Sequence, residues 1–119
     1  MKIERFIDLI AWQEGHRLVL DVYKLTTLFP HKETYSLVDQ MRRASVSITI
    51  NIAEGFSRRS SKEKRQFYYM SLGSVTELQN QLIIARDLNY MSKDSFTDIE
   101  KQTIFCNKLI FGLIKGLRS

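Results

Sequence analysis

Apolar residues recur along most of this chain at steps of three and four, which is the period of an amphipathic helix. In the first such segment, one face carries Ala11, Leu18, Val22, Leu25 and Phe29. This pattern predicts a helix over about residues 7–28. Pro30 should end it, because proline lacks a backbone donor and disfavours helical geometry in the residue before it.

The second segment predicts a helix over about residues 33–54. Its core stripe consists of Leu37, Met41, Ala44, Ile48 and Ile52. Gly55 follows directly, and glycine is the commonest residue just beyond a helix C-terminus. We therefore expect Gly55 to cap this helix.

The third segment predicts the longest helix, over about residues 61–89. Ser60 and Glu63 have the spacing of a capping box at its start. One face carries Phe67, Ser74, Leu78, Leu82 and Ala85. Ser71, Gly73 and Ser74 are small, so they should let a neighbouring helix approach closely.

The fourth segment predicts a helix over about residues 96–117, with Ser95 as its N-cap. Its stripe consists of Ile99, Cys106, Ile110, Leu113 and Leu117. Four helices with short connections favour an all-α, up-down-up-down antiparallel bundle. At 119 residues the chain should form one domain, over residues 1–119. One Pro and five Gly are too few for a β-sandwich or barrel of this length.

Three of the predicted helices carry a second apolar face, which a monomeric bundle does not need. The second helix has Val46, Ile50 and Ala53 opposite its core stripe, and the third has Tyr69, Leu72 and Ile83. The first helix has a similar flank with Trp12, His16, Val19 and Tyr23. Scattered surface hydrophobic residues are common. The helical spacing nevertheless favours a homo-oligomer with an interface at these positions.

The positive charge of the chain is concentrated in residues 40–65. This stretch holds seven Lys and Arg and two Glu, a net +5, which equals the formal net charge of the whole chain. A local excess of this kind attracts polyanions, although a charge run also simply aids solubility. As candidate nucleic-acid-binding residues we take Arg42, Arg58, Arg59, Lys62, Lys64 and Arg65.

A polar ladder flanks the core stripe of the second helix. It consists of Gln40, Arg43, Ser47, Asn51 and Glu54, at helical spacing. We interpret it as a structural or interface network in which Glu54 and Asn51 pair with an arginine or cap a helix, in preference to a ligand site.

Little in the sequence supports catalysis, a cofactor or a metal. Neither His16 nor His31 has the acidic partners or Glu-x-x-His spacing of a catalytic or di-iron site. The single cysteine, Cys106, falls on a core stripe and should be an inert buried thiol. No apolar run has the length of a membrane span, and the start Met-Lys-Ile-Glu-Arg-Phe has no signal core. We expect a cytoplasmic protein without membrane contact.

Several blocks resemble one known family. They are Trp12, Phe29-Pro30, Gln40-Met41-Arg42-Arg43-Ala44, Asn51-Ile52-Ala53-Glu54-Gly55 and Gly73-Ser74-Val75. Together they are similar to the 23S rRNA intervening-sequence proteins, a family that includes accessory proteins of diversity-generating retroelements. The resemblance implies a four-helix bundle assembled into a homopentameric ring. The retroelement members bind nucleic acid and associate with a reverse transcriptase.

These observations favour a non-enzymatic, oligomeric four-helix bundle that binds RNA or DNA through phosphate contacts, with RNA preferred. The alternative is a protein-interaction scaffold or an accessory subunit of a reverse transcriptase. A hydrolase or metal enzyme is poorly supported by the placement of histidines and acids.

Overall fold

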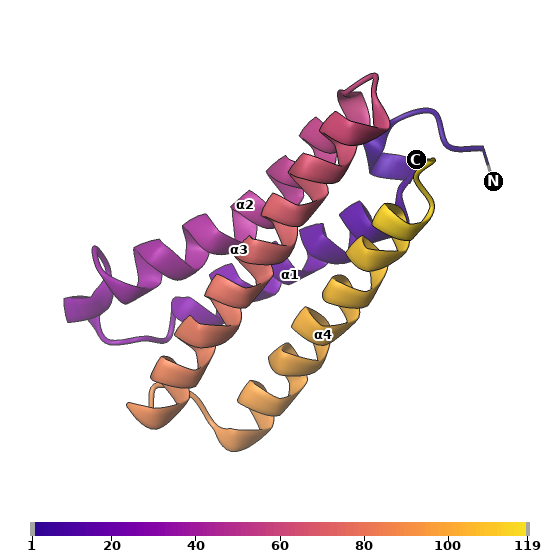
Figure 1. Cartoon of the computed structure of the whole chain (residues 1–119). Helices are drawn as coiled ribbons and strands as arrows, with labels where there is room; N and C mark the ends of the chain where they lie inside the picture. The colour runs from indigo at the N-terminus through magenta and orange to yellow at the C-terminus, as the bar shows by residue number, and fades with distance from the viewer. Residues whose placement is uncertain (1, 119) are drawn as a thin grey trace.

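Four long helices run alternately up and down the bundle in the computed structural model, which describes residues 2–118 (Figure 1). They are α1 (Ile10–Thr26), α2 (Leu37–Ser57), α3 (Ser61–Asp87) and α4 (Lys93–Lys115). Short 3₁₀ turns, η1 (Phe6–Asp8) and η2 (His31–Glu33), precede α1 and α2. The predicted all-α antiparallel bundle is therefore confirmed.

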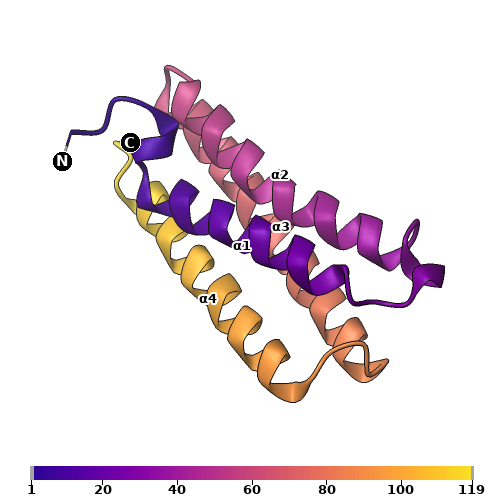
Figure 2. The same cartoon turned by 180° about the vertical axis from the view of Figure 1, so that it is seen from behind.

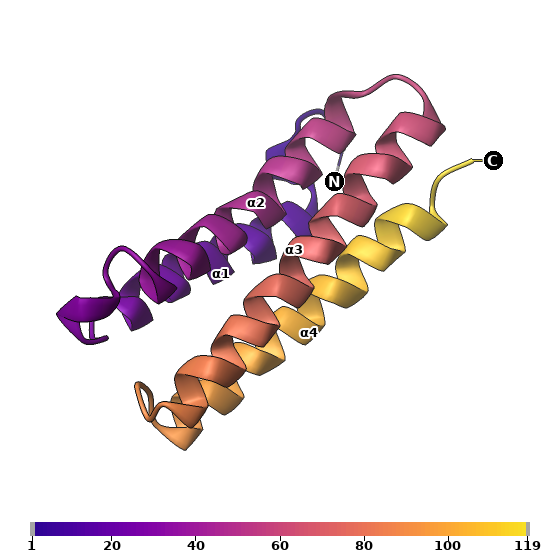
Figure 3. The same ribbon diagram turned by 60° about the vertical axis from the view of Figure 1, so that its left-hand side comes forward.

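Each helix packs against two neighbours, as the views from behind and from the side show (Figures 2 and 3). Helix α1 contacts α2 and α4, while α3 contacts the same two helices from the opposite corner. The core between them contains all five residues of the predicted α2 stripe. Its most deeply buried large side chains include Leu18, Met41, Ile48, Ile52, Leu78, Leu82 and Ile110.

Close contact between α2 and α3 depends on small side chains, as the sequence predicts for two of its three small residues. The Ser71 hydroxyl donates to the Ile48 carbonyl at 2.8 Å, and the Ser74 hydroxyl donates to that of Ser47 at 2.9 Å. Gly73 does not take part, because a Cβ at this position would meet nothing within 4 Å.

The first helix begins at Ile10, three residues later than predicted, because Asp8 stabilises a separate turn. Its carboxylate accepts hydrogen bonds from the backbone N–H groups of Arg5 and Glu4 at 2.9 and 3.0 Å. These two bonds lower the pKa of Asp8. Leu9 is then extended, so the chain cannot continue from η1 into α1 as one helix.

Gly55 does not cap α2, contrary to the prediction. The helix continues through it to Ser57, and Arg58 is the first extended residue. Gly55 is buried against α3, where an added Cβ would lie 2.6 Å from a Tyr68 ring carbon. The glycine is therefore needed for close packing and not for a left-handed turn.

The ends of α3 and α4 show capping that the sequence predicts only in part. Ser60 caps α3, as predicted, by accepting from the Glu63 backbone N–H at 3.1 Å. The cap of α4 is Ser92 and not Ser95: its hydroxyl accepts from the Ser95 N–H at 3.0 Å. Helix α4 therefore begins three residues earlier than expected.

A left-handed residue and a tyrosine fix the end of α3. Asn89 has φ 62°, and the Tyr90 N–H bonds to the Ala85 carbonyl at 3.0 Å, which together form a Schellman ending. The Tyr90 hydroxyl then donates to the Glu33 carboxylate at 2.6 Å. Hydrogen bonds from Ser36 and Tyr90 lower the pKa of Glu33. The α1–α2 and α3–α4 connections are thereby tied together at one end of the bundle.

Candidate nucleic-acid interface

The α2–α3 connection forms the other end of the bundle, and both chain termini reach this same end (Figure 1). Phe6 shares a surface hollow with Ala53 and Ser57 of α2. Ile3 shares another hollow with Leu113, near the end of α4. The N-terminal segment therefore lies beside the last turns of both helices. We call residues 2–8, 54–65 and 115–118 together the hairpin end.

The hairpin end accounts for the entire net charge of the protein. Its basic residues are Lys2, Arg5, Arg58, Arg59, Lys62, Lys64, Arg65, Lys115 and Arg118. Its acidic residues are Glu4, Asp8, Glu54 and Glu63. Nine basic and four acidic groups give +5, while the remaining nine basic and nine acidic groups of the chain cancel. Because the molecule is 45 Å long and 24 Å or less across, the charge is segregated along its long axis.

Two of the predicted binding residues stabilise the turn from α2 into α3. The Lys64 ammonium donates to the Phe56 carbonyl at 2.7 Å, so it binds the exposed carbonyls at the end of α2. The Arg58 guanidinium donates to the Glu54 carboxylate at 3.1 Å and lies over the Phe67 ring at 4.6 Å. Both cations are engaged in contacts within the protein, which explains why these two basic residues are tolerated beside the start of α3.

Three other predicted binding residues have no polar partner within the described part of the chain. Among residues 2–118, Arg59, Lys62 and Arg65 form no side-chain hydrogen bond or ion pair. Arg59 and Lys62 are exposed and Arg65 is half-buried. Lys62 and Arg65 lie three residues apart at the start of α3, so they share one face of the helix. These are the groups whose charge is available to a phosphate.

Tyr69 lies on the same face as Lys62 and Arg65, since these positions step by three and four. Its side chain is 52% exposed. The preceding Tyr68 is instead buried in the core, where burial raises the pKa of its hydroxyl. Of the two tyrosines, only Tyr69 presents an aromatic surface beside the cations.

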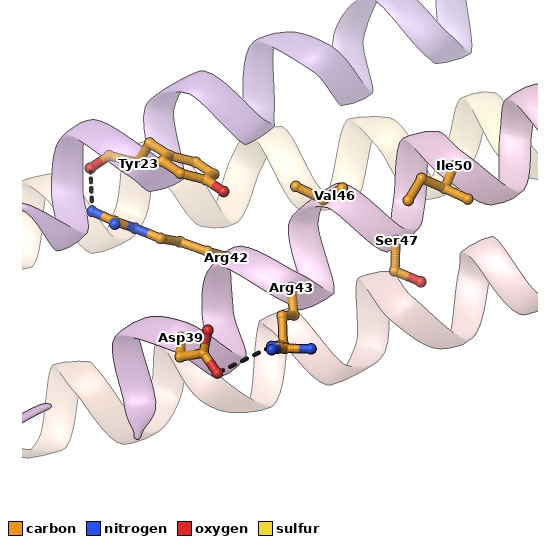
Figure 4. A pocket seen from close by; sticks show the side chains of 7 residues that line it. All are labelled: Tyr23, Asp39, Arg42, Arg43, Val46, Ser47 and Ile50. Carbon is orange, nitrogen blue, oxygen red and sulfur yellow. Dashed lines mark hydrogen bonds and ion pairs between the residues drawn. The ribbon is translucent and has the colours of Figure 1, made fainter. Parts of the chain in front are cut away.

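Arg42 lies far from the hairpin end, which corrects its assignment to one basic site. It precedes Arg58 by 16 residues on α2, or roughly 24 Å at 1.5 Å per residue. Its Nε donates to the Thr26 hydroxyl at 3.0 Å, and its guanidinium lies over the Tyr23 ring at 4.6 Å. Figure 4 shows this side chain reaching from α2 to the end of α1. Arg42 thus links two helices.

Arg42 borders an open hollow of about 550 Å³ between α1 and α2. Figure 4 shows its seven lining residues, which are Tyr23, Asp39, Arg42, Arg43, Val46, Ser47 and Ile50. Ile50 also lines a second hollow, with Phe6, Ala53, Glu54 and Ser57. The two hollows therefore adjoin along the outer side of α2.

The polar ladder on α2 is not one network. Arg43 pairs with Asp39 at 3.0 Å and Glu54 pairs with Arg58 at 3.1 Å, both within α2 or its cap. The Asn51 side chain donates to the Ser47 carbonyl at 2.9 Å. Gln40 is exposed. The predicted pairing of Glu54 with an arginine is correct, but the partner is Arg58 and the pair is exposed to solvent.

The predicted second apolar faces of α2 and α3 are exposed or half-buried, with one exception. Ile50, Tyr69 and Ile83 are 53%, 52% and 40% exposed, and Val46 and Ala53 are half-buried. Leu72 is only 8% exposed and belongs to the core, so its assignment to a subunit interface is wrong.

The single cysteine is buried, and His16 packs against an aromatic ring. Cys106 is buried in the core, and this burial, together with the charge of Glu14, raises its pKa to about 12. His16 stacks on Trp12 with ring centroids 4.8 Å apart. Within residues 2–118 there is no group of three or more His, Cys, Asp or Glu side chains placed to hold a metal ion. None of the helices described there has the length and apolar character needed to cross a membrane.

An antiparallel four-helix bundle with one strongly basic end is thus the class of protein that the geometry defines. The family model of the 23S rRNA-intervening sequence protein matches residues 7–112, and the chain belongs to this family. Its fold is similar to that of a solved structure, a protein of unknown function from the S23 ribosomal protein family of Bacteroides thetaiotaomicron. The TM-score is 0.82 at 18% identity, covering 89% of this chain and 96% of that chain. A comparison with curated proteins found no match.

Proposed function

We propose that this protein is a non-enzymatic, homo-oligomeric RNA-binding bundle that holds the phosphate backbone of RNA at its hairpin end. The observation that carries the proposal is the segregation of the entire +5 charge to that end. Exposed cations without a partner among the described residues suit phosphate contacts, which give affinity without sequence preference. The family name mentions 23S rRNA, so RNA is the polyanion that we propose first.

Arg59, Lys62 and Arg65 are the proposed phosphate ligands, with Lys2, Arg5, Lys115 and Arg118 adding to the field around them. Arg58 and Lys64 hold the turn that presents these ligands. Tyr69 offers a ring on which a base of single-stranded RNA can stack. In an oligomer each subunit repeats this set, so weak contacts on one long strand act together.

The test is binding of labelled single-stranded RNAs of several unrelated sequences, followed by fluorescence anisotropy over a range of salt concentrations. The variant Arg59→Gln, Lys62→Gln, Arg65→Gln should weaken binding to every RNA alike. Each lost phosphate contact should also reduce the slope of log affinity against log salt by about 1. The matched control is Lys24→Gln, Lys32→Gln, Lys93→Gln, which removes the same charge far from the hairpin end and should bind like the wild type.

Failure of the wild type to bind RNA at low salt would overturn the proposal, as would equal losses in the two triple variants. A wild type that assembles normally but binds neither RNA nor DNA would support the second candidate, a protein-interaction scaffold or accessory subunit of a reverse transcriptase. The exposed apolar side chains Ile50, Tyr69 and Ile83 are the observation that favours this candidate. They offer a contact surface whether the partner is another copy or a different protein.

A further inference from the structure

The outer face of α4 carries a regular pattern outside the core, and only its last residue, Lys115, also belongs to the hairpin end. Helix α4 packs against α3 and α1 and leaves its outward side uncovered (Figure 3). This side carries Ile104, Phe105 and Phe111, which are 46%, 47% and 42% exposed. At 100° per residue, these three positions and Lys101, Lys108 and Lys115 fall within an arc of about 120°. We call these six residues the α4 stripe.

The charges of the α4 stripe have a regular spacing. Lys101, Lys108 and Lys115 are separated by seven residues each, and the exposed apolar side chains lie between them. Within residues 2–118 none of the three lysines forms an ion pair. A seven-residue period of apolar and charged positions is the pattern by which one helix recognises another.

We propose that the α4 stripe docks an acidic amphipathic helix of a different protein. Such a helix would cover Ile104, Phe105 and Phe111 with its own apolar side chains. Its flanking carboxylates, repeated every seven residues, would pair with the three lysines. The lysines span 14 residues, or roughly 21 Å of helix, so the partner segment needs about three heptads.

Charge complementarity favours this occupant over the others. A two-fold contact between copies centred on the stripe would oppose Lys108 with Lys108 and Lys101 with Lys115. A head-to-tail contact with the exposed face of α2, as in a ring, would place the lysines against the face that carries Arg42 and Arg43. An RNA backbone would satisfy the lysines but leave the apolar side chains uncovered. A lipid surface requires deep insertion of the apolar face, whereas more than half of each of these three side chains is already covered by the bundle.

The test uses the full chain and a labelled synthetic helix of about 21 residues. Its heptads carry Leu at the two core positions and Glu at the flanking positions, which also keep the peptide from pairing with itself. The matched peptide has Lys in place of every Glu. We expect the acidic peptide to bind in fluorescence anisotropy and the basic peptide to fail.

Charge reversal on the protein should exchange this preference. The variant Lys101→Glu, Lys108→Glu should lose affinity for the acidic peptide by about tenfold or more and gain affinity for the basic one. Lys32→Glu, Lys93→Glu makes the same change of net charge elsewhere and should behave like the wild type. Phe105→Ser should weaken binding of the acidic peptide without changing its charge preference. Circular dichroism verifies that every variant remains folded.

Four outcomes would overturn the inference. They are no binding of the acidic peptide, equal binding by the reversed and wild-type proteins, a lower subunit number in the reversed variant, and stripe-dependent binding to anionic vesicles without peptide binding. The last two would assign the stripe to a contact between copies and to a lipid surface. RNA affinity should be the same in the two double variants, so failure here is distinguishable from failure of the RNA proposal.

Discussion

Gly55 illustrates how a single missing side chain determines the contact between α2 and α3. An added Cβ would lie 2.6 and 2.8 Å from two Tyr68 ring carbons and 3.2 Å from the Phe67 Cβ. Tyr68 is buried and cannot swing into solvent. The helices must therefore separate locally if any side chain is placed at this position.

We expect Gly55→Ala to destabilise the protein by about 1–3 kcal/mol, the usual cost of overpacking a core. Gly73→Ala is the matched control, because it lies in the interior of α3 and its Cβ would meet nothing within 4 Å. It should stabilise the protein by about 0.5–1 kcal/mol through helix propensity. Urea denaturation measures both changes. A Gly55→Ala variant as stable as Gly73→Ala would show that the Tyr68 contact is not tight.

At the residue scale, sequence patterns predicted the role of a side chain better than they predicted which residue it contacts. The inert Cys106 and the capping Ser60 follow directly from their positions in the helical period. The partner of Glu54 does not, because Arg58 lies four residues further on, beyond the point where α2 was expected to end. Only the continuation of α2 to Ser57 places the two side chains one turn apart. Similarly, Lys64 has the sequence signature of a free cation, yet the end of α2 takes up its charge.

At the scale of elements, helix interiors were predictable and helix ends less so. The 3.6-residue period rests on many positions, so one atypical residue does not change the prediction of a helix. An end depends on one hydrogen bond, and the segment 92–97 contains two serines that are each suited to cap. Ser92 is the residue that caps α4, and the helix therefore begins about one turn earlier, at Lys93.

Replacing each of these serines should reveal which one caps α4. Ser92→Ala removes the acceptor of the Ser95 N–H and should cost about 1 kcal/mol. Ser95→Ala removes only a hydroxyl that contacts the Ser92 hydroxyl at 3.0 Å, and should cost less than about 0.5 kcal/mol. Thermal unfolding followed by circular dichroism compares the two. The reverse order of stability would place the cap at Ser95.

At the scale of the whole molecule, the distribution of charge in space could not be predicted from the order of residues along the chain. Lys2, Arg5, Lys115 and Arg118 join the basic hairpin only because both termini fold back to the α2–α3 connection (Figure 2). Conversely, Arg42 is close to the hairpin in sequence but is removed from it by most of the length of α2. A charge excess read along the chain located the basic hairpin but missed the four cations that the two termini add to it.

The exposed apolar face of α2 predicts that the protein assembles into an oligomer. Ile50 is 53% exposed and lines both adjoining hollows, so it lies at the centre of the proposed contact between subunits. Multi-angle light scattering of the wild type should give about five times the chain mass of 14.0 kDa, as the family resemblance implies. Ile50→Glu would bury a charge in that contact and should yield smaller species.

Leu28→Glu is the control for this experiment. Leu28 is more exposed than Ile50, at 81%, but it follows α1 at the far end of the bundle and lines neither hollow. The same charge introduced there should leave the subunit number unchanged. If Leu28→Glu dissociates the assembly and Ile50→Glu does not, the contact lies at the end opposite the basic hairpin. If the wild type is itself a monomer of 14.0 kDa, the repeated basic ends cannot act together, and RNA affinity must come from one hairpin end alone.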